Sequence, residues 1–412
     1  MGMTDTTSRD PAAAPVGVSP ARGFLGGLEM LRAVAASAVV VDHTWALTTS
    51  PHFQGYWLVE GLGEWGVSLF FLISGFILVD SFWNEPPVSA RVFWIRRVFR
   101  IAPAYYVNVA ILFLFFASTS QVFSGQGIKQ VAASATFTHW LFPNTASSLN
   151  VNGALWTLSI EMCLYLMMPL MAWSMRRRPW LGAGCMLAIG IGYRLWITFD
   201  GNWLEHRYFE HSPVGSATAR LFMQRQFIGV LPLFVIGMLL RRLVLRWQAA
   251  HDQPSARLSP LLLVALLIPS LALLRFVERA SDFHHPFFFT FYELGLVTVM
   301  APALVYAALW SASSPSMSGR ALVWLGERSY SLYLWHFPII LAVFGRGPEV
   351  QPANMRYFWV KVVAVAVLSV AAAAISYAAI ERPARTYGRR IARRLGSSER
   401  TPRAAVSVPA AG

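Results

Sequence analysis

Long apolar runs alternate with short polar, arginine-rich segments along most of the chain. A helix needs about 20 mostly apolar residues to cross the hydrocarbon of a bilayer. The apolar stretch 131–142 is shorter than this and is expected to lie at the interface or to re-enter. The pattern therefore predicts an all-α, polytopic transmembrane helix bundle. The ten expected spans are 28–48, 64–82, 101–119, 154–175, 180–199, 221–240, 258–275, 289–311, 329–345 and 358–380.

Composition favours a membrane protein over a soluble one. Of the 412 residues, 56% are apolar and only 13% are charged, whereas a soluble globular chain carries about 25% charged residues. Cys163 and Cys185 both fall inside apolar runs, so we expect buried thiols, not a disulfide or a metal site. No metal-binding motif is present, and no metal is expected.

The net charge of +14 does not predict a nucleic-acid partner, because the cations are spread between apolar runs. With the N-terminus placed in the cytoplasm, 23 of the 34 Lys and Arg residues lie in cytoplasmic segments and 10 in outer ones. The positive-inside rule therefore predicts both termini in the cytoplasm. We expect a disordered cytoplasmic N-terminus at 1–27, a membrane domain at 28–383 and a basic, solvated cytoplasmic tail at 384–412.

Ionisable residues inside the spans are the first candidates for function, because they are costly in hydrocarbon. Arg32 and His43 are 11 residues apart in the first span, so they share one helix face about 16 Å apart along the axis. This favours a helix that lines a polar cavity. Alternatively, Arg32 reaches the cytoplasmic surface or pairs with Glu29, and His43 only joins helices by a hydrogen bond.

Three further positions carry candidate chemistry. Glu161 in the fourth span lies at a depth comparable to His43, and a His–carboxylate pair is geometrically allowed. The alternative is a protonated Glu161 bonded to a neighbouring helix. Arg97 and Arg100 share a face at the mouth of the third span, which suits phosphate groups but also serves as a topology signal. His336 lies among aromatic residues that line a cavity or form an interface belt, and spacing does not decide between the two.

Five segments together resemble membrane acyltransferase family 3, the bacterial integral-membrane O-acyltransferases. The segments, in chain order, are LEMLRAVAASAVVVDH, GVSLFFLISGFIL, RRVFRIAPAYY, ALWTLSIEMCLYLMMPL and SYSLYLWHFPI. The resemblance implies a ten-helix bundle in the bacterial cytoplasmic (inner) membrane. Such a bundle moves an acyl group, by default acetyl, from acyl-CoA to a hydroxyl of a carbohydrate or glycan. Acyl-CoA is then a co-substrate, and no tightly bound cofactor is expected.

The resemblance also implies roles for individual residues. The family's Arg-x10-His motif falls on Arg32 and His43, and its Arg-x-x-Arg motif falls on Arg97 and Arg100. The three arginines would bind acyl-CoA, and His43 would act as general base or accept the acyl group. Glu161 would orient His43 or the sugar. The expected substrate-binding residues are Trp156, Ser159, Tyr330 and His336.

The chain departs from the family pattern at two places, and other functions stay open. Glu29 and Met30 stand where members usually have Asp-Gly, and Asp42 is an unusual neighbour for the histidine. A proton-coupled transporter or flippase of lipid-linked sugars could use His43 and Glu161 as a relay. Acylation of a secondary metabolite such as a macrolide is a further alternative. The lipid bilayer is an expected partner, and the sequence carries no signal for an oligomeric state.

Overall fold

The computed structural model describes most of the chain. Residues outside the described ranges include 1–22 and 399–412, so most of the expected N-terminal segment and the end of the expected tail lie outside them. The described ranges are 23–48, 58–84, 87–143, 145, 152–200, 216–251, 259–280, 286–309, 317–345 and 355–398.

Within the described ranges the regular structure is helical, and they contain no β-strand. This is the all-α architecture that hydrocarbon demands, because each helix satisfies its own backbone hydrogen bonds. The helices are α1 (Gly23–Thr48), α2 (Leu62–Leu78), α3 (Asp80–Trp83), α4 (Ala90–Phe115), α5 (Thr119–Val122), α6 (Gly125–Ala135), η2 (Gly153–Leu155), α8 (Trp156–Arg177), α9 (Pro179–Asp200), α11 (Ser216–Gln224), α12 (Phe227–Ala250), α13 (Pro260–Ala265), α14 (Ile268–Ala280), α15 (Pro286–Leu309), α16 (Met317–Glu327), α17 (Ser329–Phe344), α18 (Met355–Ser376), the π-helical η3 (Tyr377–Glu381) and α19 (Arg382–Ser398).

Nine helical segments in the described part of the chain are long and apolar enough to cross a membrane. They coincide with nine of the ten expected spans. The remaining expected span, 329–345, is α17, an apolar helix of 16 residues. At 1.5 Å per residue it is about 24 Å long, somewhat less than the hydrocarbon thickness of about 30 Å. The chain is thus a multi-pass helical membrane protein, whose described residues include nine long candidate spans and one shorter apolar helix.

Several helix ends differ from the expected ones for local reasons. α4 begins at Ala90 and not near 101, because Ser89 accepts a hydrogen bond from the Val92 N–H and starts the helix on the arginine-rich side. The expected span 258–275 is divided into α13 and α14 at Leu266–Leu267. Within the stretch 131–142, α6 ends at Ala135 and a turn follows. Hydropathy locates the apolar centre of a helix better than its polar ends.

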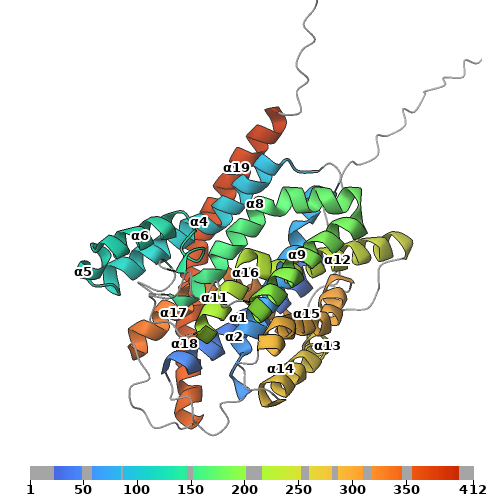
Figure 1. The fold of residues 1–412 in the computed structure, drawn as a ribbon. Helices are drawn as coiled ribbons and strands as arrows, with labels where there is room; N and C mark the ends of the chain where they lie inside the picture. The colour runs from blue at the N-terminus through green and yellow to red at the C-terminus, as the bar shows by residue number, and fades with distance from the viewer. Residues whose placement is uncertain are drawn as a thin grey trace, which may run out of the picture.

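The first two helices lie in the middle of the bundle (Figure 1). α1 contacts α2, α15, α16, α17 and α18, and α2 also packs on α12. α12 in turn contacts α9 and α15. α5 and α6 project to one side of the bundle (Figure 1). α1 therefore contacts protein around most of its circumference. Its ionisable side chains can find partners on neighbouring helices and need not face lipid.

α2 and α12 approach each other closely at two glycines. A Cβ added at Gly75 would overlap the carbonyl oxygen of Phe234, and one added at Gly237 would overlap that of Leu72. Small residues at a helix interface let backbones come together where lipid offers no hydrophobic driving force between helices. The α2–α12 contact thus depends on the absence of side chains at these two positions.

The C-terminal segment forms one continuous helical rod. α18 runs through the π-helical turn η3 into α19, and α19 lies along α4 (Figure 1). Residues 384–398, expected to be a solvated tail, are therefore helical and packed on the bundle. We call the end of the bundle that carries Arg97, Arg100, Arg177 and Arg385 the basic end.

A substitution at Gly75 tests the close α2–α12 contact. We expect Gly75→Ala to lower the free energy of unfolding by about 1–3 kcal/mol, because the added methyl forces the helices apart. Gly184→Ala is the matched control, since a Cβ at that helical position meets no atom within 4 Å. Thermal unfolding of the purified proteins in detergent measures both. Equal melting temperatures for the two variants would show that the contact is not tight.

Candidate functional site

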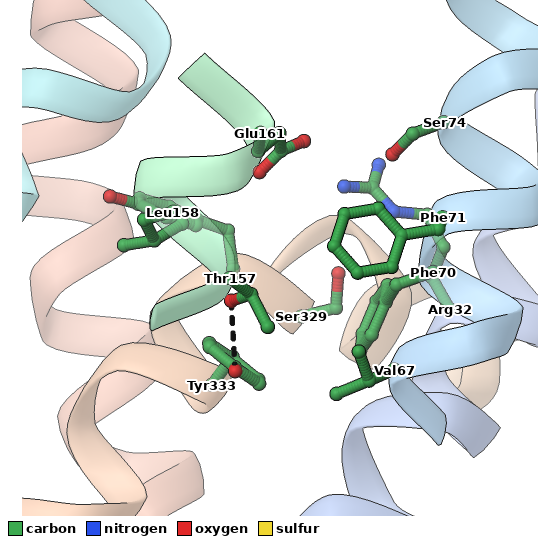
Figure 2. A pocket seen from close by; sticks show the side chains of 11 residues that line it. Arg32, Val67, Phe70, Phe71, Ser74, Thr157, Leu158, Glu161, Ser329 and Tyr333 are labelled. Atoms are coloured by element: carbon green, nitrogen blue, oxygen red, sulfur yellow. Dashed lines mark hydrogen bonds between the residues drawn. The ribbon is translucent and has the colours of Figure 1, made fainter. Parts of the chain in front are cut away.

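A cavity of about 60 Å³ lies inside the bundle between α1, α2, α8 and α17. Arg32 of α1 and Glu161 of α8 face it from opposite sides (Figure 2). A space of this size holds a few water molecules. An ionisable pair around such a cavity is typical of a functional site within a membrane protein. Its other lining residues are Val67, Phe70, Phe71, Ser74, Thr157, Leu158, Ser329, Tyr330 and Tyr333.

Arg32 both lines the cavity and pairs with its neighbour on the helix. Its Nη1 lies 3.4 Å from Glu29 Oε1, one turn earlier, and both side chains are partly buried. The expected pairing with Glu29 therefore coexists with the expected cavity-lining position. Glu29 holds the guanidinium without removing it from the cavity.

His43 meets His336 and not Glu161. His43 Nδ1 lies 2.7 Å from His336 Nε2, a hydrogen bond between α1 and α17. The two rings are stacked with centroids 5.0 Å apart, and Phe337 covers His43 with its edge at 5.8 Å. His336 is fully buried. The sequence identified both histidines but assigned His336 to the substrate, whereas here it is the partner of His43.

Tyr333 stands between the cavity and the two imidazoles. It lines the cavity, and its ring centroid is 5.7 Å from that of His336. Its hydroxyl accepts a hydrogen bond from Thr157 (2.9 Å) and donates one to the Ala154 carbonyl (2.6 Å). His43 is not among the lining residues, so Tyr333 is the residue that adjoins both the cavity and the histidine pair.

Glu161 interacts at the level of the arginines. Its Oε1 accepts a hydrogen bond from Tyr165 one turn later on α8. Its charge also lies within interaction range of Arg97, as do those of Arg100 and Arg32. The structure thus brings together the three arginines that the sequence selected, and adds Glu161 to them.

Arg97 is held by aromatic rings. Its Cζ lies 5.5 Å from the Phe93 ring centroid and 5.8 Å from that of Tyr165. Its Nε is buried and has no hydrogen-bond partner among the described residues. Tyr330 lies nearby, since its side chain lines the cavity and its hydroxyl donates to the Ile101 carbonyl of α4 (2.8 Å). A buried guanidinium N–H without an acceptor is suited to an anionic ligand.

Ser159 and Trp156 lie away from the cavity. Ser159 is fully buried, and its hydroxyl lies 3.1 Å from Nδ1 of His139. His139 Nε2 donates to the Leu155 carbonyl (3.1 Å), so Ser159 is the donor to Nδ1. Trp156 packs beneath the guanidinium of Arg225 at 4.8 Å. In the structure Ser159 therefore holds the start of α8, where the sequence expected a substrate contact.

A buried cluster of arginines and carboxylates near His43 was missed by the sequence reasoning. Arg194 pairs with Glu293, and Arg225 pairs with Glu64. The charge of Arg225 is within interaction range of His43. These ionisable residues lie within or beside expected spans, so the rule that selected Arg32 would also have selected them.

Asp42 has a structural partner. It accepts hydrogen bonds from the backbone N–H groups of Gly61 and Gly63 at the start of α2. Gly61 itself provides no side-chain cap. A carboxylate at this position satisfies the free N–H groups of a helix and opposes its positive end. Asp42, the unusual neighbour of His43 in the sequence, thus joins α1 to the start of α2.

Comparisons with known proteins agree with the five-segment resemblance. A family model described as "Acyltransferase domain" matches residues 25–380. Nodulation protein 10 of Rhizobium leguminosarum bv. viciae is 26% identical over 386 residues, which cover 88% of this chain and 94% of the relative. No solved structure matches.

Two relatives carry names that state an activity. The peptidoglycan O-acetyltransferase OatA of Listeria monocytogenes is 27% identical, with 89% of this chain and 57% of the relative covered. The putative peptidoglycan O-acetyltransferase YrhL of Bacillus subtilis is also 27% identical, with 89% and 55% covered. The chain therefore spans little more than half of the length of these two relatives.

The buried His139 predicts a pH dependence of stability. Burial lowers the pKa of His139 to about 4, against an ordinary value of 6.5. Between these values the unfolded chain binds a proton that the folded chain does not. The contribution of neutral His139 to the free energy of unfolding is therefore fully present above pH 6.5. About 3 kcal/mol of this free energy is lost as the pH falls from 6.5 towards 4.

His139→Gln is expected to remove this part of the acid destabilisation. The measurement is the free energy of unfolding at pH 7.5 and 4.5 in detergent for both proteins. His251→Gln is the control, because His251 is exposed. If His139→Gln shows the same pH slope as the wild type, His139 is already charged in the folded protein.

Proposed function

Because the chain belongs to the acyltransferase family whose model matches residues 25–380, we propose that it transfers an acyl group from a CoA thioester to a hydroxyl of a carbohydrate or glycan. The names of two relatives favour acetyl as the acyl group and a cell-wall or surface glycan as the acceptor. The family resemblance favours the bacterial cytoplasmic membrane, and the distribution of Lys and Arg favours an orientation with the basic end in the cytoplasm.

The observation that carries the proposal is the arrangement of α1 and α17. Arg32 on α1, together with Ser329 and Tyr330 on α17, lines the cavity. Further along the same two helices, His43 and His336 form a buried hydrogen bond. α1 and α17 thus present an anion-binding guanidinium at the cavity and a basic nitrogen further along the bundle. A CoA thioester needs this order, because its phosphates and its reactive carbonyl lie at opposite ends of a long arm.

The donor would enter from the basic end. Arg97 and Arg100 bind phosphate groups, for which guanidinium offers paired N–H donors. The pantetheine arm then follows α1 past Arg32, and Glu161 accepts a hydrogen bond from an amide N–H of the arm. The rise of about 16 Å between Arg32 and His43 carries the thioester to the histidine once the Tyr333 ring moves aside.

His43 would act as the general base. Its Nε2 takes the proton from the acceptor hydroxyl as the oxygen attacks the thioester carbonyl carbon. The tetrahedral intermediate collapses, the carbon–sulfur bond breaks, and the imidazolium returns the proton to the CoA thiolate. Direct transfer is the version that we propose. An acyl group trapped on His43 after incubation without acceptor would contradict it.

His336 would set the tautomer of His43. A His–His hydrogen bond has one donor, so Nε2 of His43 is free to accept a proton only when its Nδ1–H donates to His336 Nε2. In this arrangement His336 carries its own proton on Nδ1, a buried atom with no hydrogen-bond partner among the described residues. The tautomer with Nδ1–H on both rings leaves the lone pair of His43 on Nε2, where the reaction needs it.

Replacement of His43 tests the catalytic role. We expect His43→Ala to lower the rate of acyl transfer from labelled acetyl-CoA by about 10²–10⁴-fold, because the base that takes the proton of the acceptor hydroxyl is lost. The rate is measured on purified protein, and acetylated surface glycans are quantified by mass spectrometry in cells. His251→Ala is the control and retains wild-type activity. Equal consumption of acetyl-CoA by His43→Ala and wild type would remove the catalytic assignment.

Replacement of His336 tests the orienting role. Hydrogen-bond partners that orient metal-bound histidines are worth about 10- to 100-fold in activity, and we expect a similar factor for the partner of a catalytic imidazole. We expect His336→Ala to lower kcat by this factor and to leave the KM for acetyl-CoA near its wild-type value. His336→Gln, whose side-chain oxygen can accept from His43, is expected to recover part of the loss. A rise in KM with kcat unchanged would instead assign His336 to substrate binding.

A further inference from the structure

The C-terminal helix α19 is fixed against the part of α4 that carries the phosphate-binding arginines. A Cβ added at Gly388 would fall 2.5 Å from Cβ of Phe99. The rings of Phe99 and Tyr387 meet edge to face with centroids 5.5 Å apart. These contacts place the Tyr387–Gly388 part of α19 beside Phe99, which lies between Arg97 and Arg100 on α4.

The π-helical turn before α19 aims charged groups at the same place. Glu381, its last residue, is 2% exposed and accepts a hydrogen bond from Ser331 of α17. The charge of Glu381 lies within interaction range of Arg100, Arg385 and Arg32. Single π-helical turns inside α-helices are frequent at functional sites. Here the turn brings the carboxylate of Glu381, and Arg385 one turn later, close to Arg32 of α1 and Arg100 of α4.

Arg385 differs from the other arginines of its helix. It is partly buried, its Cζ lies 6.0 Å from the Tyr377 ring centroid, and its charge interacts with those of Arg100 and Arg32. The other five arginines of α19 are exposed; they are Arg382, Arg389, Arg390, Arg393 and Arg394. Arg385 instead turns inward, where Glu381 is the carboxylate within interaction range and Arg100 and Arg32 add like charge.

The carboxylates around these arginines do not balance them. Four guanidinium groups, from Arg32, Arg97, Arg100 and Arg385, meet the carboxylates of Glu29, Glu161 and Glu381. Glu161 and Glu381 also accept hydrogen bonds from hydroxyl groups, and Arg97 Nε has no acceptor in the described part of the chain. The cluster therefore has an excess positive charge and a buried donor without a partner.

We propose that Arg385 binds a phosphate group of the acyl-CoA donor together with Arg97 and Arg100, so that the C-terminal helix is part of the donor site. The inference rests on the proposed function. Three guanidinium groups from two helices can surround one phosphate or share the two of a pyrophosphate. A membrane lipid offers the same phosphate chemistry, so the test separates the two sources.

The test compares the binding of CoA and pantetheine, which lacks the phosphates, to protein in detergent and in lipid nanodiscs. We expect Arg385→Gln to weaken CoA binding about tenfold, equal to 1.4 kcal/mol, and to leave pantetheine binding unchanged. Arg385→Lys should fall between the two proteins, because it keeps the charge but loses the paired donors. Arg393→Gln, on the exposed side of α19, is the matched control and should bind CoA as the wild type does.

Each contrary result has a separate meaning. Equal CoA affinity for wild type and Arg385→Gln overturns the role of Arg385 and leaves the proposed function standing. Equal weakening of CoA and pantetheine also overturns it, since the effect is then not on phosphate. If only the stability in nanodiscs with anionic lipid changes, Arg385 binds a lipid headgroup and the inference is wrong. If the wild type binds no CoA in either medium, the donor assignment of the proposed function itself fails.

Discussion

Ionisable groups inside a membrane bundle must find their partners within the protein, and this constraint organises the structure. Arg194 and Glu293 are almost completely buried and paired, and Arg225 is paired with Glu64 above the ring of Trp156. Removing one partner of such a pair costs about 3–5 kcal/mol, because the other charge stays buried alone. One pair joins α9 to α15, and the other joins α2 to the segment before α12. α2 and α15 in turn contact α1, the helix that carries His43.

The remaining charges are less completely satisfied, and their excess is what gives the basic end its chemistry. Arg32 forms an ion pair with Glu29 at 3.4 Å and still lines the cavity. Arg97 stacks on aromatic rings, and its Nε has no hydrogen-bond partner among the described residues. Cation–π contacts stabilise a guanidinium without using up its hydrogen-bond donors. Such groups are held in place before a ligand arrives, so little order is lost when an anion binds.

Two parallel elements connect the levels of the site. α1 passes from Arg32 to His43, and α17 passes from Ser329 to His336 beside it. Tyr333 adjoins both the cavity at the arginine level and the ring of His336 at the histidine level. Its hydroxyl accepts a hydrogen bond from Thr157 and donates one to the Ala154 carbonyl.

Much of the fold could be predicted from the sequence, because the hydrophobic pattern alone determines where helices cross a membrane. The shared face of Arg32 and His43 followed from the period of the helix. The partners of these residues could not be predicted, since a contact between helices depends on their packing. The hydrogen bond between His336 and His43 was therefore not predicted. Ser159 was expected to contact the substrate, whereas it bonds to His139. The role of Asp42 as the cap of α2 was not predicted either. The charge-rich segment after Glu381 was interpreted as solvated because composition does not show that α19 packs on α4.

The central claim is that one path along α1 joins the arginines of the basic end to His43. Its most direct test is a cryo-EM structure of the protein with a non-transferable CoA thioether bound. We expect the phosphates among Arg97 and Arg100, and Tyr333 turned away. The carbon that replaces the acyl carbonyl should lie about 4–5 Å from His43 Nε2, so that an acceptor oxygen fits within about 3 Å of both. Density for the thioether outside the bundle, or ending on the arginine side of an unmoved Tyr333, would contradict this path.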